Sequence, residues 1–460
     1  MSSQHSQLAC RGALLTLLRR LHFYIGLFVG PFIFVAALTG TLYVLTPQIE
    51  NALYHEALHA EAYGPQKSLA QQIAAARKYI GEDASIYAVR PAPRPGDTTR
   101  VQFVDPALGA SESRAIFISP STLAVKGDMT VYGTSGVLPL RTWIDQFHRG
   151  LLLGDTGRLY SELAASWLWV AALGGVVLWL TSRPKRKLKV RRTPQTTARH
   201  WHITLGAFLL LGLMFFSATG LTWSQWAGGN IDKLRSELGW MTPQVNTTLT
   251  PQTGHQHHDP HAEHHAMMAG MVMPAAADES WDRALHAARA AGIESDKLEI
   301  RPSLAADKAW TVTEIDRAWP THVDAVAVDP TNFTAIDRVR FADFPLIAKL
   351  TRWGVDAHMG VLFGLPNQLL LAAFGFGLCA MIVLGYRMWW LRRPAVSANN
   401  PVHTLSEAWF ALPQALRAGS LFIAALLGYC LPVMGVSLLL FVAVDSARWW
   451  LRVFRKQVSP

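Results

Sequence analysis

Apolar residues are gathered into long runs, and this pattern predicts helices that cross a membrane. Three of the runs hold at least 18 residues with almost no charge: Phe23–Leu45, Ile203–Trp223 and Leu369–Trp390. A fourth run, Leu163–Leu180, is just long enough. Because the hydrocarbon core of a bilayer is about 30 Å thick, a helix of about 20 apolar residues spans it. The sequence therefore predicts four core transmembrane helices.

A further apolar region, Leu421–Val444, is interrupted by Pro432. We favour a hairpin of two helices, Trp409–Cys430 and Val433–Leu451, with the proline at the first position of the second helix, where its missing N–H costs nothing. The alternative is one long helix kinked at the proline.

The two long polar segments between the spans share one order of patterns. Each begins with helical spacing of apolar positions, at Ser68–Tyr79 and at Ser280–Ala291. Strand-like stretches and a proline-containing turn follow. The four stretches are Arg100–Val104, Ala115–Ser119, Trp310–Ile315 and Ala325–Val328. We predict one small α+β module in each segment.

The chain contains an internal duplication. With His22 set on His202, an offset of 180, Gly26 meets Gly206 and the Thr39-Gly40 pair meets Thr219-Gly220. With His148 set on His358, the offset is 210. This register also matches Trp143 with Trp353, Gly150 with Gly360, Gly154 with Gly364, Trp179 with Trp389, and Arg183-Pro184 with Arg393-Pro394. The two copies start on the same side, so the repeat is parallel.

The basic residues predict the orientation. The net charge is +10, and Arg183–Arg199 carries eight Lys or Arg and no acid. A short basic loop between two spans is typical of the cytoplasmic side. We therefore predict a multi-pass protein of the bacterial inner membrane, with a cytoplasmic N-terminus and periplasmic long loops, rather than a nucleic-acid-binding protein.

The predicted fold is an all-α membrane bundle of four core spans and a C-terminal hairpin, with two small α+β periplasmic modules. Its segments are a cytoplasmic tail (1–20), the first span (21–45), the first module (46–147), a histidine region with the second span (148–182), the basic loop (183–199), the third span (200–224), the second module (225–357) with a His/Met-rich insertion (245–274), a histidine region with the fourth span (358–391), a cytoplasmic loop (392–408), and the hairpin with its basic tail (409–460).

Four histidines at the span ends are candidate cofactor ligands, because ionisable residues there are costly and are often functional. The repeat pairs His22 with His202 at one membrane face and His148 with His358 at the other. Two imidazoles from facing helices suit bis-histidine haem ligation. Gly26 and Gly206 lie one turn beyond the first pair and would leave room for a flat macrocycle. The alternatives are histidines that touch lipid headgroups, or zinc, which usually has four ligands; His200 could also replace His202.

A tract rich in histidine and methionine lies in the second long segment. Imidazole and thioether together suit copper best, with zinc, nickel or iron possible. The alternative is a low-complexity insertion without a fixed site. The candidate metal ligands are His255, His257, His258, His261, His264, His265, Met267, Met268, Met271 and Met273.

These residues resemble the PepSY-associated transmembrane family, which includes iron-regulated inner-membrane proteins and ferric-siderophore reductases. The resemblance is carried by Arg20-Leu-His22, by its copy at His202, and by His148-Arg-Gly150 and His358-Met-Gly360; the turns at Ser119-Pro120 and Asp329-Pro330 resemble those of PepSY domains. It implies a protein with two haems b, each held by two histidines, that passes electrons to a periplasmic ferric complex. Reduction to Fe(II) would weaken chelation by hard oxygen ligands.

The leading hypothesis is a di-haem metalloreductase, with no catalytic residue assigned. Its partners would be the lipid bilayer, an unidentified electron donor on the cytoplasmic side, and a periplasmic ferric siderophore. The His/Met tract departs from the siderophore-reductase pattern and makes cupric ion a second candidate acceptor. One alternative is a non-enzymatic metal-binding or sensor protein. Another is a transporter, which the parallel repeat favours and the lack of acidic residues in the core spans disfavours.

Overall fold

The structure is a computed structural model, and it describes residues 2–61, 64–182, 193–249, 279–303, 305–392 and 405–458. The chain is mostly helical and includes an eight-stranded antiparallel sheet. It divides into two compact units. The helical unit comprises Met1–Tyr43, Gln146–Gly239 and Leu369–Pro460, and the sheet unit comprises Val44–Asp145 and Trp240–Gln368. The two units are described separately.

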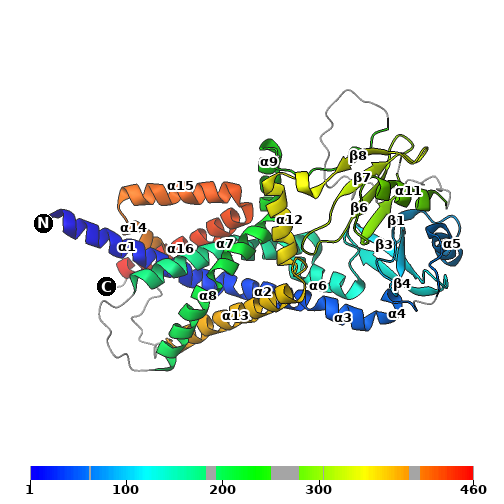
Figure 1. Ribbon diagram of the computed structural model, residues 1–460. Helices are drawn as coiled ribbons and strands as arrows, with labels where there is room; N and C mark the ends of the chain where they lie inside the picture. The colour runs from blue at the N-terminus through cyan, green and yellow to red at the C-terminus, as the bar shows by residue number, and fades with distance from the viewer. Residues whose placement is uncertain are drawn as a thin grey trace. The chain divides into compact units, whose positions relative to one another are not determined.

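The helical unit is built from the long apolar helices (Figure 1). Two of its helices, α6 (Pro139–Gly150) and α13 (Leu365–Leu391), have their first residues in the sheet unit and the rest in the helical unit. The others are α1 (Ser2–Tyr24), α2 (Gly30–Val44), α7 (Gly154–Thr181), α8 (Pro194–Thr222), α9 (Trp226–Glu237), α14 (Leu405–Phe410), α15 (Gln414–Cys430) and α16 (Pro432–Val458).

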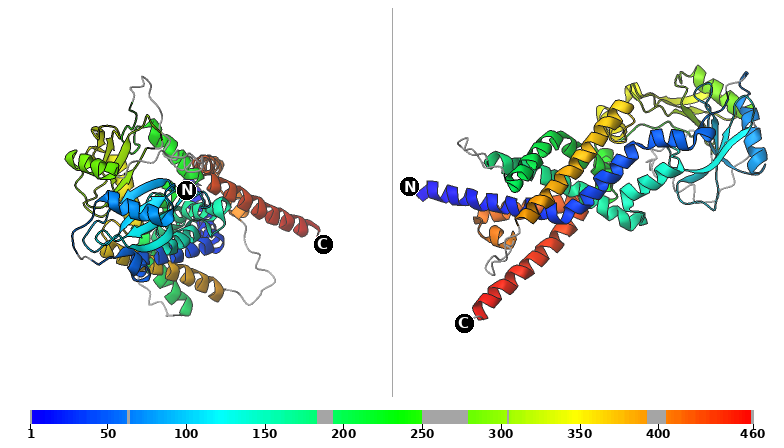
Figure 2. Two further views of the ribbon diagram at one scale, coloured as in Figure 1. Left: turned by 90° about the vertical axis from the view of Figure 1, so that its right-hand side faces the viewer. Right: turned by 90° about the horizontal axis from the view of Figure 1, so that it is seen from below.

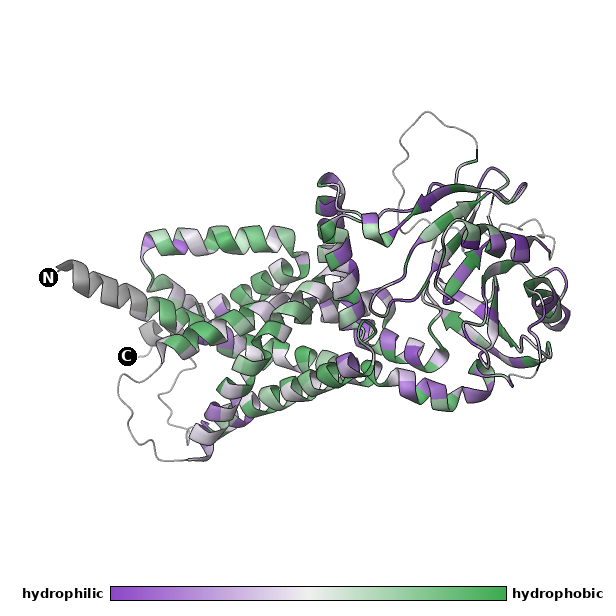
Figure 3. Ribbon diagram, in the orientation of Figure 1, coloured by the Kyte–Doolittle hydropathy of each residue, from purple (hydrophilic) through white to green (hydrophobic). Residues whose placement is uncertain are grey.

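Five helices among the described residues are long and apolar enough to cross a membrane: Gly12–Val44, Gly154–Thr181, Pro194–Thr222, Leu365–Leu391 and Pro432–Leu451. Apolar residues dominate these helices, whereas polar residues are frequent on the helices and strands of the sheet unit (Figure 3). Large side chains on them face outward, such as Phe208 and Leu211, which are 85% and 84% exposed. Exposed apolar side chains on such helices are suited to contact with lipid.

The first span is one continuous helical run with a π-helical turn in its middle. The turn covers Ile25–Val29, between α1 and α2, and the run is unbroken in Figure 2. The equivalent span of the second copy, α8, is α-helical throughout. A π-turn rotates one half of a helix relative to the other and is frequent at functional sites. The two copies therefore differ directly after His22.

The C-terminal apolar region consists of two helices, α15 and α16, with Pro432 as the first residue of the second. The helices pack closely where two glycines meet, because a Cβ built on Gly435 would lie 2.7 Å from the Cα of Gly428. Short helix α14 precedes them as a separate element. Asp445 of α16 caps it by accepting hydrogen bonds from the backbone N–H and the hydroxyl of Ser406, at 2.7 and 2.8 Å.

The sheet unit holds two sequence-related halves. The first half contributes α3 (Thr46–Leu53), α4 (His55–Leu58), α5 (Leu69–Ile80), β1 (Ile86–Arg90), β2 (Thr99–Phe103), β3 (Glu112–Ile118) and β4 (Val125–Tyr132). The second half contributes α11 (Glu279–Ala290), β5 (Leu298–Arg301), β6 (Trp310–Glu314), β7 (Ala325–Val328), β8 (Ala335–Val339), the 3-10 turn Phe341–Asp343 and α12 (Leu346–His358).

The strands of both halves form one continuous sheet in the order β4-β3-β2-β1-β5-β6-β7-β8. The halves meet at the antiparallel pair Val89 and Ile300. The two α+β patterns of the sequence are therefore halves of one sheet rather than separate bodies. The edge strand β8 exposes most of its side chains, whereas β1 and β2 at the centre are largely buried.

Helices α5 and α11 cover the same face of this sheet. Their buried residues, among them Ile73 and Trp281, pack into one apolar core with the strands. A carboxylate joins the two helices, because Asp282 of α11 accepts hydrogen bonds from the first two N–H groups of α5, at Leu69 and Ala70, both at 2.9 Å. Unpaired N–H groups at a helix start need such an acceptor. Asp282 therefore connects the second half of the sheet unit to the first through hydrogen bonds.

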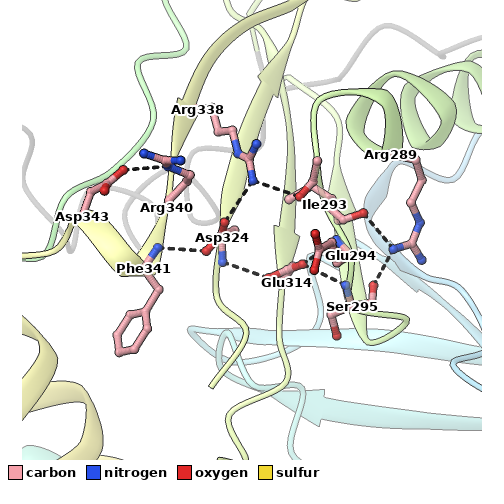
Figure 4. A network of polar contacts seen from close by, with 11 residues as sticks. Arg289, Ile293, Glu294, Ser295, Glu314, Asp324, Arg338, Arg340, Phe341 and Asp343 are labelled. Carbon is pink, nitrogen blue, oxygen red and sulfur yellow. Dashed lines mark hydrogen bonds and ion pairs between the residues drawn. The ribbon is translucent and has the colours of Figure 1, made fainter. Parts of the chain in front are cut away.

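A polar network ties the second half together at the end of α11 (Figure 4). Glu314 of β6 accepts hydrogen bonds from the backbone of Glu294 and Ser295, both at 2.8 Å, and from Asp324 at 3.2 Å. Asp324 in turn accepts from the backbone of Phe341 at 2.8 Å and pairs with Arg338 at 3.3 Å. These contacts fix the loops that connect the strands of the second half.

Candidate cofactor site

The structure brings His22 and His202 together inside the helical unit. His22 lies near the end of α1 and His202 in the third turn of α8. Their ring centroids are 6.5 Å apart, and the ring planes are nearly perpendicular at 81°. His200, the alternative ligand on α8, is exposed and lies beside Trp201. The geometry therefore favours His202 over His200 as the partner of His22.

Each of these histidines is held by a carbonyl group of another helix. The Nδ1 of His22 is 3.0 Å from the carbonyl oxygen of Ala171 on α7. The Nδ1 of His202 is 2.9 Å from the carbonyl oxygen of Met381 on α13. A carbonyl oxygen only accepts, so each Nδ1 carries the proton and each Nε2 keeps its lone pair in the neutral ring. Ala171 and Met381 are themselves 210 residues apart, the offset of the repeat.

Each inner histidine also packs against a glycine at a matched position. A Cβ built on Gly175 would lie 3.2 Å from Cε1 of His22, and one built on Gly385 would lie 3.7 Å from Cε1 of His202. These glycines are again 210 residues apart. A Cβ on Gly26 would meet no described atom within 4 Å, whereas one on Gly206 would lie 3.4 Å from the sulfur of Met381. Gly175 and Gly385 therefore lie directly against the two rings, whereas Gly26 and Gly206 do not.

The inner pair has the donor set of a bis-histidine metal site, two imidazoles from different helices. Two metal–nitrogen bonds of about 2 Å in line would place the ring centres roughly 6.4 Å apart, close to the observed 6.5 Å. An edge-to-face contact between two rings without a metal would give a similar distance between the ring centres. The Nδ1–carbonyl contacts favour a ligand role, because metal-binding histidines usually donate their other N–H in this way. No group of three or more His, Cys, Asp or Glu in the described part of the chain is arranged to hold a bare ion. Two imidazoles are the ligand set of a bis-histidine haem, whereas zinc usually has four ligands.

His148 lies in the helical unit and packs against the end of α2. Its Nδ1 is 3.0 Å from the hydroxyl oxygen of Thr39, and a Cβ on Gly40 would lie 3.2 Å from its Cε1. The hydroxyl of Tyr160 donates to the backbone carbonyl of His148. Burial lowers the pKa of His148 to about 4, which the carbonyl of Ala36 opposes only in part. His148 is therefore neutral near pH 7, as a metal ligand must be.

His358 is the last residue of α12, in the sheet unit. Arg317 contacts two residues near His358: it pairs with fully buried Asp356, and its Nη2 lies 3.4 Å from the sulfur of Met359. Arg352, one turn before Asp356, forms a second ion pair with it at 3.2 Å. Because His148 and His358 belong to different units, the pairing of these two histidines stays a prediction from the repeat.

The glycines near the outer histidines have backbone roles. Gly360 adopts a positive φ of 73° where α12 ends, a conformation that glycine tolerates best. A Cβ on Gly157 would lie 1.8 Å from the carbonyl oxygen of Gly150, so these two backbones are in close contact. The turn itself explains Gly150 and Gly360 without a macrocycle. The His/Met tract, His255–Met273, lies outside the described residues, as does most of the basic loop.

A buried acid in α7 was not expected from the sequence. Glu162 is fully buried and accepts hydrogen bonds from the N–H groups of Trp226 and Ala227, both at 3.0 Å. These groups lie at the start of α9, where a carboxylate is stabilised by the unpaired donors and the helix dipole. Glu162 therefore serves as a helix cap, and its burial needs no ion pathway as an explanation.

These features define a multi-span membrane protein with paired histidines inside an internally duplicated helical unit. The chain matches the model of the PepSY-associated TM region over residues 19–392. It therefore belongs to the PepSY-associated transmembrane family. No curated protein sequence matches the chain.

Proposed function

We propose that this protein is a di-haem b metalloreductase of the bacterial inner membrane. It would move electrons from the cytoplasmic side to a periplasmic acceptor, a ferric siderophore or, as second choice, cupric ion. His22 and His202 would hold the inner haem, and His148 and His358 the outer one. Haem b, when bound, supplies a one-electron Fe(III)/Fe(II) couple. The observation that carries the proposal is the inner pair, 6.5 Å apart with both Nδ1 atoms on helix carbonyls at repeat-related positions.

The chain's own residues would do three things at the inner site. The carbonyls of Ala171 and Met381 hold the proton on each Nδ1, so that each Nε2 is the ligand atom. Gly175 and Gly385 let the rings lie against α7 and α13 without a clash. The apolar side chains of these helices would surround the site with a low-polarity environment. The ligands are thereby ready before the cofactor enters.

The orientation rests on the distribution of charge. Arg19 and Arg20 precede the first inner histidine, and Arg387 and Arg392 lie at the end of α13. With the positive residues inside, the inner pair lies at the cytoplasmic face and the sheet unit is periplasmic. An electron donor would then dock from the cytoplasm, and the metal complex would approach from the periplasm.

The test is a haem count on the purified protein. The wild type should show a sharp Soret band, split α bands on reduction, and about two haems per chain by pyridine haemochrome. His22→Ala and His202→Ala should each lose about one haem, whereas His200→Ala, a matched change on the exposed face of α8, should keep both. A colourless wild-type protein, grown with sufficient iron and haem precursor, would refute the proposal.

The His/Met tract supports a second function, metal binding without reduction. Six histidines and four methionines within residues 255–273 are a composition that suits copper. Deletion of residues 254–273 should then remove copper or zinc binding, measured by titration of the metal-free protein, and leave the haem count unchanged. If the intact protein binds copper but no haem, the non-enzymatic metal-handling function replaces the reductase.

A further inference from the structure

Thr39 and His148 form a polar contact in the interior of the helical unit. Thr39 is 1% exposed, and its hydroxyl oxygen lies 3.0 Å from Nδ1 of His148. The same oxygen is 2.7 Å from the carbonyl oxygen of Val35 and 3.2 Å from that of Ala36. The threonine therefore joins the ring to the backbone of its own helix, α2.

The direction of the hydrogen bonds follows from the number of protons. A hydroxyl group has one proton, and the carbonyl oxygen of Val35, which can only accept, takes it. The lone pairs of the threonine oxygen are then left for the ring, so Nδ1 of His148 must be the donor. This assigns the proton to Nδ1 and leaves the lone pair on Nε2.

The neighbouring glycine makes the contact possible. A Cβ on Gly40 would lie 3.2 Å from Cε1 of His148, tighter than an ordinary contact. The Thr-Gly pair thus supplies both an acceptor for the ring and the space in which the ring lies. The carbonyl contacts at His22 and His202 produce the same state, with Nδ1 protonated and Nε2 available. At His148 a side-chain hydroxyl acts together with the main-chain carbonyl of Ala36, whereas at the inner pair a main-chain carbonyl is the partner of each ring.

We propose that Thr39 is the positioning residue for His148: it fixes the ring orientation and the Nδ1–H tautomer, so that Nε2 is the nitrogen that binds the outer haem. This inference rests on the proposed function for the identity of the ligand. It adds a specific role for a threonine that does not itself touch the iron. Partners of this kind affect metal affinity by about 10- to 100-fold when removed.

The experiment compares Thr39→Val with Thr39→Ser in the full-length, haem-loaded protein. Thr39→Val keeps the shape but removes the hydroxyl, so that only the carbonyl of Ala36 is left beside the ring. The outer haem should then transfer to apomyoglobin about 10- to 100-fold faster than in the wild type. Thr39→Ser restores the hydroxyl and should restore slow transfer. The inner haem, followed through its own α band, should be unaffected. Thr39→Ala gives a second test if the valine variant does not fold, because alanine favours the helix.

Thr181→Val is the matched control, since Thr181 makes the same 2.7 Å bond to the carbonyl four residues earlier, Val177, near the end of α7. It should transfer haem at the wild-type rate. If Thr39→Val also keeps wild-type rates while His148→Ala loses one haem, the role of Thr39 is refuted and the di-haem proposal stands. If the wild type holds no haem, both proposals are refuted.

Discussion

The imidazole rings of His22 and His202 lie 6.5 Å apart and nearly perpendicular, although 180 residues separate them in the chain. Each ring packs against a glycine and is hydrogen-bonded to a backbone carbonyl of the second span of its own copy. That span is α7 for His22 and α13 for His202. The two copies therefore build the site by the same contacts, and each contact can be tested at both of its positions.

Gly175→Val should weaken the inner site. A Cβ there would lie 3.2 Å from Cε1 of His22, and the two methyl groups of valine would displace the ring further. We expect the inner haem to transfer to apomyoglobin on the order of tenfold faster, or more, than in the wild type. Gly419→Val on α15 is the control, because a Cβ at Gly419 meets no described atom within 4 Å. Equal haem retention in both variants would contradict the assignment.

The repeat register made the inner pair predictable from the sequence. The same register carries a further signal, since Gly175 and Gly385 are identical residues at the offset of 210. The hydrogen bonds from the histidines to backbone carbonyls could not be predicted, because every residue type has a backbone carbonyl and the sequence does not mark the one that is used. Ala171 lies 149 positions from His22. The contact between Thr39 and His148 was not predictable either, because the repeated Thr-Gly pair marks the register without indicating which residue the threonine contacts.

The sheet was only partly predictable. The four expected strands correspond to β2, β3, β6 and β7, which alternate or bury apolar residues. The edge strands β4 and β8 were missed because edge positions tolerate polar residues, as in Val125–Tyr132. The central strands β1 and β5 pair through Val89 and Ile300, which joins segments more than 200 residues apart. No local pattern encodes that join.

Arg317→Gln should destabilise the sheet unit. Asp356 is fully buried, and its Oδ1 accepts from Nε of Arg317 at 2.6 Å. Arg317 is one of two arginines paired with this buried carboxylate, and Arg352 remains at 3.2 Å in the variant. The cost should therefore be more than about 1 kcal/mol but below the roughly 3–5 kcal/mol expected when a buried charge loses its sole partner. Thermal unfolding followed by circular dichroism in detergent would measure the loss. Arg340→Gln removes an exposed pair with Asp343 and should change stability by less than about 1 kcal/mol. Similar shifts in the two variants would argue against a buried charge pair.

Asp282→Ala should loosen the join between the two halves of the sheet unit. The carboxylate caps the start of α5 through two bonds of 2.9 Å, so its loss should cost about 1–2 kcal/mol of unfolding free energy. Asp296→Ala removes an acid that is 76% exposed and serves as the control. Hydrogen exchange should show faster exchange at the N–H groups of Leu69 and Ala70 in the first variant only. Unchanged protection there would rule out the capping role.

Glu299 should make the sheet unit sensitive to acid. Burial alone would raise the pKa of Glu299, but Arg90 and Arg301, each 2.6 Å from a carboxylate oxygen, outweigh it and the pKa is lowered. The unfolded chain then binds the proton more readily, so the stabilisation is complete above the unfolded pKa of about 4.3 and is lost as pH falls through the folded value. Glu299→Gln should lower the melting temperature at pH 7, because two arginines lose their anion. It should also flatten the decline in melting temperature below about pH 5 relative to the wild type. Parallel profiles for the two proteins would show that Glu299 titrates alike in both states, and that the arginines do not hold its charge.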